Sequence, residues 1–369
     1  MRLNLAPIVP LFHMLMGDDF RENKNYPAAV ILVPNKELCL QMHRMAMEVY
    51  SAIDPEVRNV GVGVETSVTG YWPFEDDSCP HILICTPAFV GKFLRGPHVL
   101  DEDLFRSIRH CVMDEADMLL EGSYLKDIEK IVDAFKVTRR RMIQMGEIQV
   151  HTSTVQYILS AATLPSVGMR SIEKYIEERF PRAKWISNAH LHKHHPRILQ
   201  SFHYLPHSSH LPGEEFLTDQ RLNIIIHALF NREIPSNSSI AVDFLEKLPR
   251  DEDGLVQPDD STMIFVNTAE VATELAEALR RHRIRCSEYH KLQPLIEKQQ
   301  ELLKFRENEV KVLVCTDHAA RGLDIPNVRH VIQAEFAENV VQHLHRIGRA
   351  SRAGALGRTT SIVGNIDIS

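Results

Sequence analysis

Several patterns are missing from this sequence. No apolar run reaches the roughly 18 residues that a membrane-spanning helix needs, so no membrane span is expected. The six cysteines form no C-x-x-C pair, which predicts reduced, mostly buried thiols in a reducing compartment inside the cell. The phosphate-binding loop G-x-x-x-x-G-K-[ST] does not occur either. A secretion signal is not expected, because Pro7 and Pro10 interrupt the apolar opening stretch and no small-residue cleavage site follows.

Composition and charge are those of an ordinary globular protein. Of the 369 residues, 44% are hydrophobic and 25% are charged, and the length is enough for two domains with cores of their own. The formal net charge of −7 gives no sign of a polyanionic partner. It does not exclude a locally basic surface, because net charge says little about any one site.

Short apolar runs alternate with helical patterns, which predicts an α/β fold with parallel sheets. The helices predicted between the strands include 37–50, 271–281 and 295–305, and one face of the first carries Leu38, Met42, Met45 and Val49 as core packing. The predicted strands are 28–33, 81–85, 108–113, 157–159, 263–266, 312–315 and 330–334.

The pattern breaks down between the two series of strands, where His, Pro and Ser gather. We therefore predict a first domain at 1–188, a linker at 189–220 and a second domain at 221–369. Histidines 190, 192, 194 and 195 of the linker have no acidic or cysteine partners at ligand spacing, so no zinc site is expected there.

The tetrad Asp114-Glu115-Ala116-Asp117 directly follows an apolar strand pattern. An aspartate at a strand end can hold Mg²⁺, and the glutamate beside it can polarise an attacking water. The alternative is a solvated helix start, where acidic side chains favour the helix dipole. The tetrad alone leaves both interpretations open.

A second cluster, His345-Arg346-Ile347-Gly348-Arg349-Ala350-Ser351-Arg352, lies far downstream. Arg349 and Arg352 are three residues apart, so on one helical turn their side chains point the same way. Two guanidinium groups aimed at one point need an anion between them, and a γ-phosphate suits their planar shape. The alternative is a basic helix face with unrelated ion pairs.

A third cluster follows the predicted strand 312–315. It consists of Thr316-Asp317 and then Ala320-Arg321-Gly322-Leu323-Asp324-Ile325-Pro326. Parallel α/β sheets bind ligands at the carboxyl ends of their strands, so a glycine and a carboxylate at this place are consistent with a site. Turn-forming glycines and capping acids are also common there, and this alternative stays open.

In this order, D-E-A-D, A-R-G-L-D-I-P and H-R-I-G-R resemble the motifs of the DEAD-box RNA helicases of superfamily 2. The resemblance implies two RecA-like domains that close over ATP and a single strand of RNA. The implied function is an ATP-dependent RNA helicase that locally unwinds or remodels RNA or RNA–protein complexes. Weaker matches lie at Pro34-Asn35-Lys36-Glu37-Leu38, Thr86-Pro87, Ala161-Ala162-Thr163 and 263–268.

The resemblance also implies roles for individual residues. Catalysis would rest on Asp114, Glu115, Arg349 and Arg352, with Asp114 holding Mg²⁺. The nucleotide would meet Asp114, Asp117, Gly322, Asp324 and His345. Coupling of hydrolysis to unwinding would involve Ala161, Ala162 and Thr163. RNA phosphates would meet Pro34, Lys36, Thr86, Thr316 and Arg321, with little sequence specificity because such contacts read the backbone.

The sequence departs from the family pattern at several motifs. Family T-R is Asn35-Lys36 here, which keeps a positive charge, and T-P-G-R is Thr86-Pro87-Ala88-Phe89, which loses an arginine near the RNA path. Family S-A-T is Ala161-Ala162-Thr163, unless Ser160 substitutes by a one-residue shift. The departure from S-A-T predicts weaker coupling of hydrolysis to unwinding, whereas Ala350-Ser351 in place of T-G leaves the two finger arginines in place.

The stretch 5–11 resembles the helix that follows the family's G-K-T, so the first domain is expected to be truncated, without the Q motif and the phosphate loop. Without that loop this polypeptide is expected to bind ATP poorly, because each charged hydrogen bond is worth roughly 1.5–3 kcal/mol. The alternative is a non-enzymatic RNA-binding scaffold, a pseudohelicase, which the intact Glu115, Arg349 and Arg352 argue against. A DNA-directed motor of the same superfamily is a third alternative.

The compartment, the RNA target and the protein partners are the least determined. A faint resemblance of 159–165 and of the region around Trp185 to organelle branches of the family adds a mitochondrion or plastid to the intracellular expectation. No pattern in the sequence indicates which RNA or which protein partner is involved.

Overall fold

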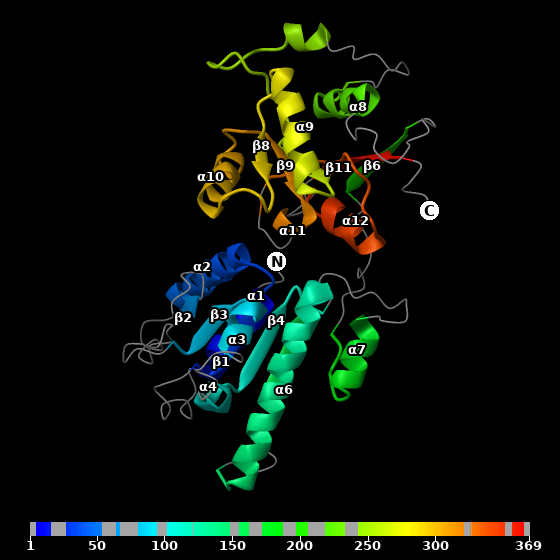
Figure 1. Cartoon of the computed structure of the whole chain (residues 1–369). Coiled ribbons are helices and arrows are strands. Elements are labelled where there is room, and N and C mark those ends of the chain that lie inside the picture. Colours follow the sequence, from blue (N-terminus) through cyan, green and yellow to red (C-terminus); the bar gives the residue numbers. More distant parts are fainter. Residues whose placement is uncertain are drawn as a thin grey trace. The chain divides into compact units, whose positions relative to one another are not determined.

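The computed structural model describes residues 5–15, 27–53, 64–66, 80–93, 102–120, 122–147, 155–161, 172–186, 197–205, 218–232, 243–320, 325, 327–350 and 356–364. The chain divides into two compact units, Met1–Leu191 and His192–Ser369 (Figure 1). Of the helices in the described ranges, none combines the length and apolarity that crossing a lipid bilayer requires. The five cysteines in these ranges are free and buried, as predicted.

The first unit is built on a five-stranded sheet in the order β2-β3-β1-β4-β5, and all of its strand pairs are parallel. Its strands are β1 (Ala29–Leu32), β2 (Val64–Thr66), β3 (Ile82–Cys85), β4 (His110–Asp114) and β5 (Gln156–Ser160). Its helices are α1 (Leu5–Leu15), α2 (Lys36–Ala52), α3 (Pro87–Phe93), α4 (Glu102–Ser107), α5 (Ala116–Leu119), α6 (Gly122–Gln144) and α7 (Ile172–Arg179).

Successive residues of β1 face two different hydrophobic cores, because side chains alternate across a strand. Ala29 and Ile31 pack with residues of α1 and α2, whereas Val30 and Leu32 pack with residues of α6. Helices therefore cover both faces of this sheet, as expected for parallel strands that read as unbroken apolar runs. The methionine-containing face of α2 is core, since Met42 and Met45 are buried there.

The second unit holds a six-stranded, wholly parallel sheet in the order β6-β11-β10-β7-β9-β8. Its strands are β6 (Ile198–Tyr204), β7 (Thr262–Val266), β8 (Ser287–Tyr289), β9 (Val312–Thr316), β10 (His330–Gln333) and β11 (Gly357–Val363). Its helices are α8 (Asp219–Leu229), the 3-10 helix η5 (Asp243–Lys247), α9 (Ala269–Arg281), α10 (Leu295–Arg306), α11 (Asp317–Ala320) and α12 (Val340–Ile347).

All seven predicted strands and the three predicted helices are confirmed, and the α/β fold with parallel sheets with them. The predicted linker 189–220 is wrong over β6, which pairs with β11 and begins the second sheet earlier than expected. Strand β6 was missed because it is an edge strand in which most side chains are exposed and no apolar run forms. Strand β11 was missed because it carries Arg, Thr and Ser, although five of its residues in a row are buried.

Candidate active site

The predicted residues of the first unit gather along one edge of its sheet. Asp114 ends β4, Thr86 directly follows β3, and Ala161 directly follows β5. Leu32 at the end of β1 is level with Cys85 on one side and Met113 on the other, which brings Pro34 to the same edge. This is the carboxyl edge of a parallel sheet, where α/β proteins bind ligands.

Asparagine 35 explains how Lys36 is placed at that edge. The Asn35 side-chain oxygen accepts a hydrogen bond of 2.8 Å from the backbone N–H of Leu38, so Asn35 caps the first turn of α2. Lys36 is then the first residue of the helix and its side chain is exposed. The departure from the family's threonine at position 35 therefore preserves a helix cap.

Asp114 is the most perturbed acidic group of this edge. Its side chain is 3% exposed, its Oδ1 accepts a hydrogen bond from the Ser160 hydroxyl, and its Oδ2 is buried with no hydrogen-bond partner among the described residues. Burial above all, and then the negative charge of Glu115, raise the pKa of Asp114 to about 7. A buried carboxylate oxygen without a partner is costly unless a cation neutralises it, so this residue fits the Mg²⁺ that the sequence predicts here.

Replacing Asp114 by asparagine is expected to stabilise the first unit at pH 8 by roughly 1–3 kcal/mol. The pKa of Asp114 is raised from 3.8 to about 7 in the folded state. Between these pH values the carboxyl group ionises in the unfolded chain but stays protonated in the folded one, so the aspartate destabilises the fold more as the pH rises. The gain should therefore be near zero at pH 4 and grow to pH 7. The gain in stability stays below the full value of about 1.4 kcal/mol per pKa unit because Asn keeps a buried amide group. Denaturant unfolding at pH 4, 6 and 8 measures this gain, with the α6 substitution Asp127→Asn as control. An equal effect of Asp114→Asn at all three pH values would contradict the prediction.

Ser160 lies directly opposite Asp114 in the pairing of β4 and β5. Its hydroxyl donates to Asp114 Oδ1, so the serine that stands one residue early in the sequence does contact the acidic tetrad. Of the three residues predicted to couple hydrolysis to unwinding, Ala161 is half-buried beside this contact, whereas Ala162 and Thr163 lie outside the described residues. Their coupling role stays a prediction.

Glu115 adopts a backbone conformation that few non-glycine residues adopt. Its φ of 54° and ψ of 49° are in the left-handed region, and its side chain makes no cap hydrogen bond to α5. Such a conformation costs of order 1–3 kcal/mol and occurs mainly where function constrains the chain. Asp114 and Asp117 are 3% and 2% exposed, which argues against the alternative of a solvated helix start.

An arginine of the second unit forms a buried network that the sequence did not predict. Arg346 on α12 is 1% exposed, and its Nε and Nη2 donate to the two carboxylate oxygens of Asp317 at 2.9 and 2.5 Å. Its Nη2 also donates to the Asn267 side-chain oxygen at 2.6 Å, and its Nη1 donates to the Glu335 carbonyl at 2.6 Å. One guanidinium thus joins α12 to the carboxyl ends of β7, β9 and β10.

The other predicted residues of the second unit are only partly described. Thr316 ends β9 and is buried, and His345 is half-buried on α12. Arg349 is 7% exposed and lies one turn after Arg346, and its backbone N–H donates to the Arg346 carbonyl at 3.1 Å. These residues lie at the carboxyl edge of the sheet, with the Arg346 network. The predicted residues that lie outside the described ranges are Arg321, Gly322, Asp324 and Arg352.

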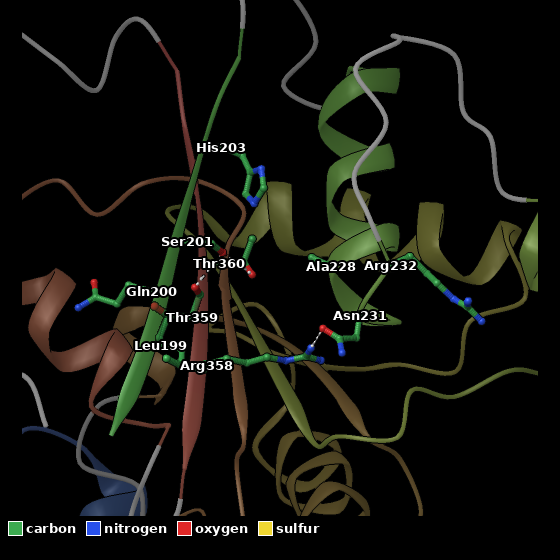
Figure 2. Close-up of a pocket in the computed structure, with 10 residues that line it drawn as sticks. All are labelled: Leu199, Gln200, Ser201, His203, Ala228, Asn231, Arg232, Arg358, Thr359 and Thr360. Carbon is green, nitrogen blue, oxygen red and sulfur yellow. Dashed lines mark hydrogen bonds between the residues drawn. The ribbon is translucent and has the colours of Figure 1, made fainter. Parts of the chain in front are cut away.

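A pocket of about 360 Å³ lies elsewhere in the second unit, between β6, β11 and the end of α8. Figure 2 shows Arg358 reaching toward Asn231, to whose side-chain oxygen it donates a hydrogen bond. The Ser201 hydroxyl likewise donates to the Thr360 hydroxyl oxygen at 3.3 Å. None of the predicted site residues lines this pocket, and its polar groups connect strands and helix to one another.

Comparison with known proteins identifies the family. The DEAD/DEAH box helicase model matches residues 5–170, and the helicase conserved C-terminal domain model matches residues 242–354. The DEAD-box ATP-dependent RNA helicase 22 of Oryza sativa subsp. japonica is 29% identical over 90% of this chain, and that of Arabidopsis thaliana is 29% identical over 97%. This chain belongs to the DEAD-box helicases of superfamily 2, a family of enzymes.

Solved structures show the same fold. Mss116p bound to ssRNA and AMP-PNP has a TM-score of 0.69 at 20% identity, covering 98% of this chain and 64% of that one. Dbp5 of S. cerevisiae, bound to RNA and ADP BeF3, has a TM-score of 0.62 at 20% identity, covering 96% and 76%. The two parallel-sheet units are therefore RecA-like. The chain spans 63% and 68% of the length of the two plant relatives.

Proposed function

We propose that this chain carries the two motor units of an ATP-dependent RNA helicase that locally unwinds or remodels RNA. The observation that carries the proposal is the Asp114 carboxylate, with one oxygen held by Ser160 and the other buried without a hydrogen-bond partner among the described residues. It stands beside Glu115 at the carboxyl edge of a parallel sheet. Family membership and relatives named as RNA helicases support this assignment.

Different residues of the chain would carry out different parts of ATP hydrolysis. Asp114 would hold Mg²⁺, which when bound neutralises charge on the phosphates of ATP. Glu115 would accept a proton from the attacking water, and Arg349 and Arg352 would stabilise the charge that develops on the γ-phosphate. Arg346 stays with Asp317 and positions α12, so it is not free to reach the nucleotide.

RNA would be held through its backbone. Pro34, Lys36 and Thr86 lie on the carboxyl edge of the first unit, and Thr316 and Arg321 belong to the corresponding edge of the second unit by sequence. Contacts of this kind read phosphates and sugars, and so little base preference is expected. ATP binding by this polypeptide alone is expected to be weak, because no G-K-[ST] loop is present in its sequence.

Strand displacement tests the proposal. A short RNA duplex with a single-stranded tail is mixed with the chain, or with the chain extended at its N-terminus by the Q motif and phosphate loop of a related DEAD-box helicase, and release of the labelled strand is followed with and without ATP. ATP-dependent release from RNA but not from the matched DNA duplex is the expected result. Release from DNA alone would favour a DNA motor, and RNA binding with neither release nor ATP turnover in the extended chain would favour the scaffold.

A further inference from the structure

Helix α6 extends beyond the sheet that it covers. Its 23 residues span about 34 Å, whereas the five residues of β4 span about 17 Å. The Arg139 guanidinium donates a hydrogen bond to the carbonyl of Ile108, two residues before β4, so this part of α6 lies at the amino edge of the sheet. Figure 1 shows the C-terminal half of α6 running past that edge. It lies opposite the edge that carries Asp114.

Basic side chains gather on this amino edge. Lys136, Arg139 and Arg140 share one face of α6 because they are spaced by three and four residues. Arg109 directly precedes β4, and Arg179 at the end of α7 forms an ion pair with Asp133 on α6. These five cations, from three separate segments of the first unit, are called here the amino-edge basic surface.

The cations of this surface lie close enough to repel one another. Burial above all, and then the charge of Arg109, lower the pKa of Arg139. The pKa of Lys136 is lowered by burial and by the charges of Arg179 and Arg140, against which Asp133 acts in the opposite direction. Arg109, Lys136 and Arg140 are exposed, and like charges held together at a surface cost stability unless an anion lies between them.

Local packing does not account for the whole surface. Arg139 binds a backbone carbonyl and Arg179 binds Asp133, so these two have structural roles. Lys136 and Arg140 form neither a hydrogen bond nor an ion pair with any residue in the described part of the chain. The protein as a whole has a formal net charge of −7, so its composition does not explain a cluster of positive charges here.

We propose that the amino-edge basic surface binds the phosphates of single-stranded RNA and acts as a second RNA contact, apart from the path at the carboxyl edge. Two further features favour RNA over an acidic protein. Most of the cations are arginines, whose planar fork suits phosphate. The described segment after Arg179 exposes Arg182, Lys184 and a Trp185 that is 47% exposed, which combines charge with a ring for stacking. Being remote from Asp114, the contact needs no nucleotide.

The test compares two double substitutions on one helix of the full chain. Lys136→Gln with Arg140→Gln removes two charges from the surface, and Lys126→Gln with Lys130→Gln removes two exposed charges nearer the start of α6. Affinity for labelled single strands of about 10 and 40 nucleotides is measured by anisotropy without nucleotide. With the longer strand, the slope of log affinity against log salt should become shallower by about 1.4 in the first variant only, since each RNA phosphate contact contributes about 0.7.

Each outcome decides the proposal. Binding of labelled poly-glutamate is measured in parallel. An unchanged salt slope for RNA in the Lys136→Gln, Arg140→Gln variant overturns the proposal. A variant that loses poly-glutamate binding but keeps RNA binding also overturns it and would assign the surface to an acidic protein. Lys36→Gln, on the predicted carboxyl-edge path, separates this proposal from the helicase function. If only Lys36→Gln weakens binding, the second contact is wrong; if only the α6 variant does, the second contact stands and the predicted path is wrong.

Discussion

Replacing Asp317 by alanine is expected to destabilise the second unit by about 3–5 kcal/mol. The substitution leaves the guanidinium of Arg346, which is 1% exposed, without its carboxylate partner. The remaining contacts of Arg346 are a side-chain amide oxygen and a backbone carbonyl, which satisfy hydrogen bonds but do not neutralise the charge. Because α12 is tied to β7, β9 and β10 through this group, the loss should affect all of these elements.

Hydrogen exchange of backbone amides in β7, β9 and β10 measures this effect. Tryptophan fluorescence provides the internal control, since Trp72 and Trp185 both belong to the first unit and should report no change. The matched surface substitution is Glu277→Ala, which breaks an exposed pair with Arg281 at 3.6 Å and should cost below about 0.5 kcal/mol. Adding Arg346→Met to Asp317→Ala should recover part of the loss. A loss below about 1 kcal/mol would show that the pair is dispensable.

Replacing Glu115 by glutamine is expected to lower RNA-stimulated ATP turnover by about 10²–10⁴-fold, the usual contribution of a general base. Glutamine keeps the size and hydrogen-bonding shape of the side chain but cannot accept a proton from water. The fold should be unaffected, because the left-handed backbone at this position is already occupied by a non-glycine residue. RNA affinity should be unaffected as well, since Glu115 is not on the predicted RNA path.

Turnover is measured in the chain extended at its N-terminus by the Q motif and phosphate loop of a related DEAD-box helicase and, beside it, in the 369-residue polypeptide. The control is Asp127→Asn on α6, which removes one carboxylate far from the edge that carries Asp114. Unchanged turnover in Glu115→Gln would refute the assigned role of Glu115. Turnover in the polypeptide alone that disappears in the variant would show instead that hydrolysis proceeds without a phosphate loop, contrary to the weak ATP binding proposed here.

The strands of the α/β fold were predictable where burial on both faces makes a strand continuously apolar. β1 and β3 are of this kind, β4, β7, β9 and β10 carry an apolar run with a polar residue at one or both ends, and each of the six was found. β11 was not, because it is mostly polar, and two of its side chains form hydrogen bonds with the neighbouring strand β10: the Gln333 amide donates to the Ser361 hydroxyl at 2.8 Å, and His330 lies 2.9 Å from the Thr360 hydroxyl. No pattern along the chain reveals a hydrogen bond between side chains on neighbouring strands.

The site was predictable as a set of residues but not as an arrangement. The spelling and order of D-E-A-D and H-R-I-G-R indicated Asp114, Glu115 and Arg349. They could not show that Arg346, in the same motif, is buried in a pair with Asp317. A partial signal was present, since a buried arginine needs an acidic partner nearby, and Asp317 directly follows a strand that the sequence predicts.

The sequence by itself determined the family, the parallel-sheet class and the identity of the acidic tetrad, because these depend on local periodicity and on motifs that are contiguous in the chain. Only the tertiary structure decided the state of Asp114, whose pKa rises because folding removes water from it and holds the charge of Glu115 beside it, although the hydrogen bond from Ser160 acts in the opposite direction. It also brought Arg109, Lys136, Arg140 and Arg179 to one surface. Both results depend on distances between residues remote in sequence, and Coulomb and desolvation energies follow those distances rather than the order of the chain.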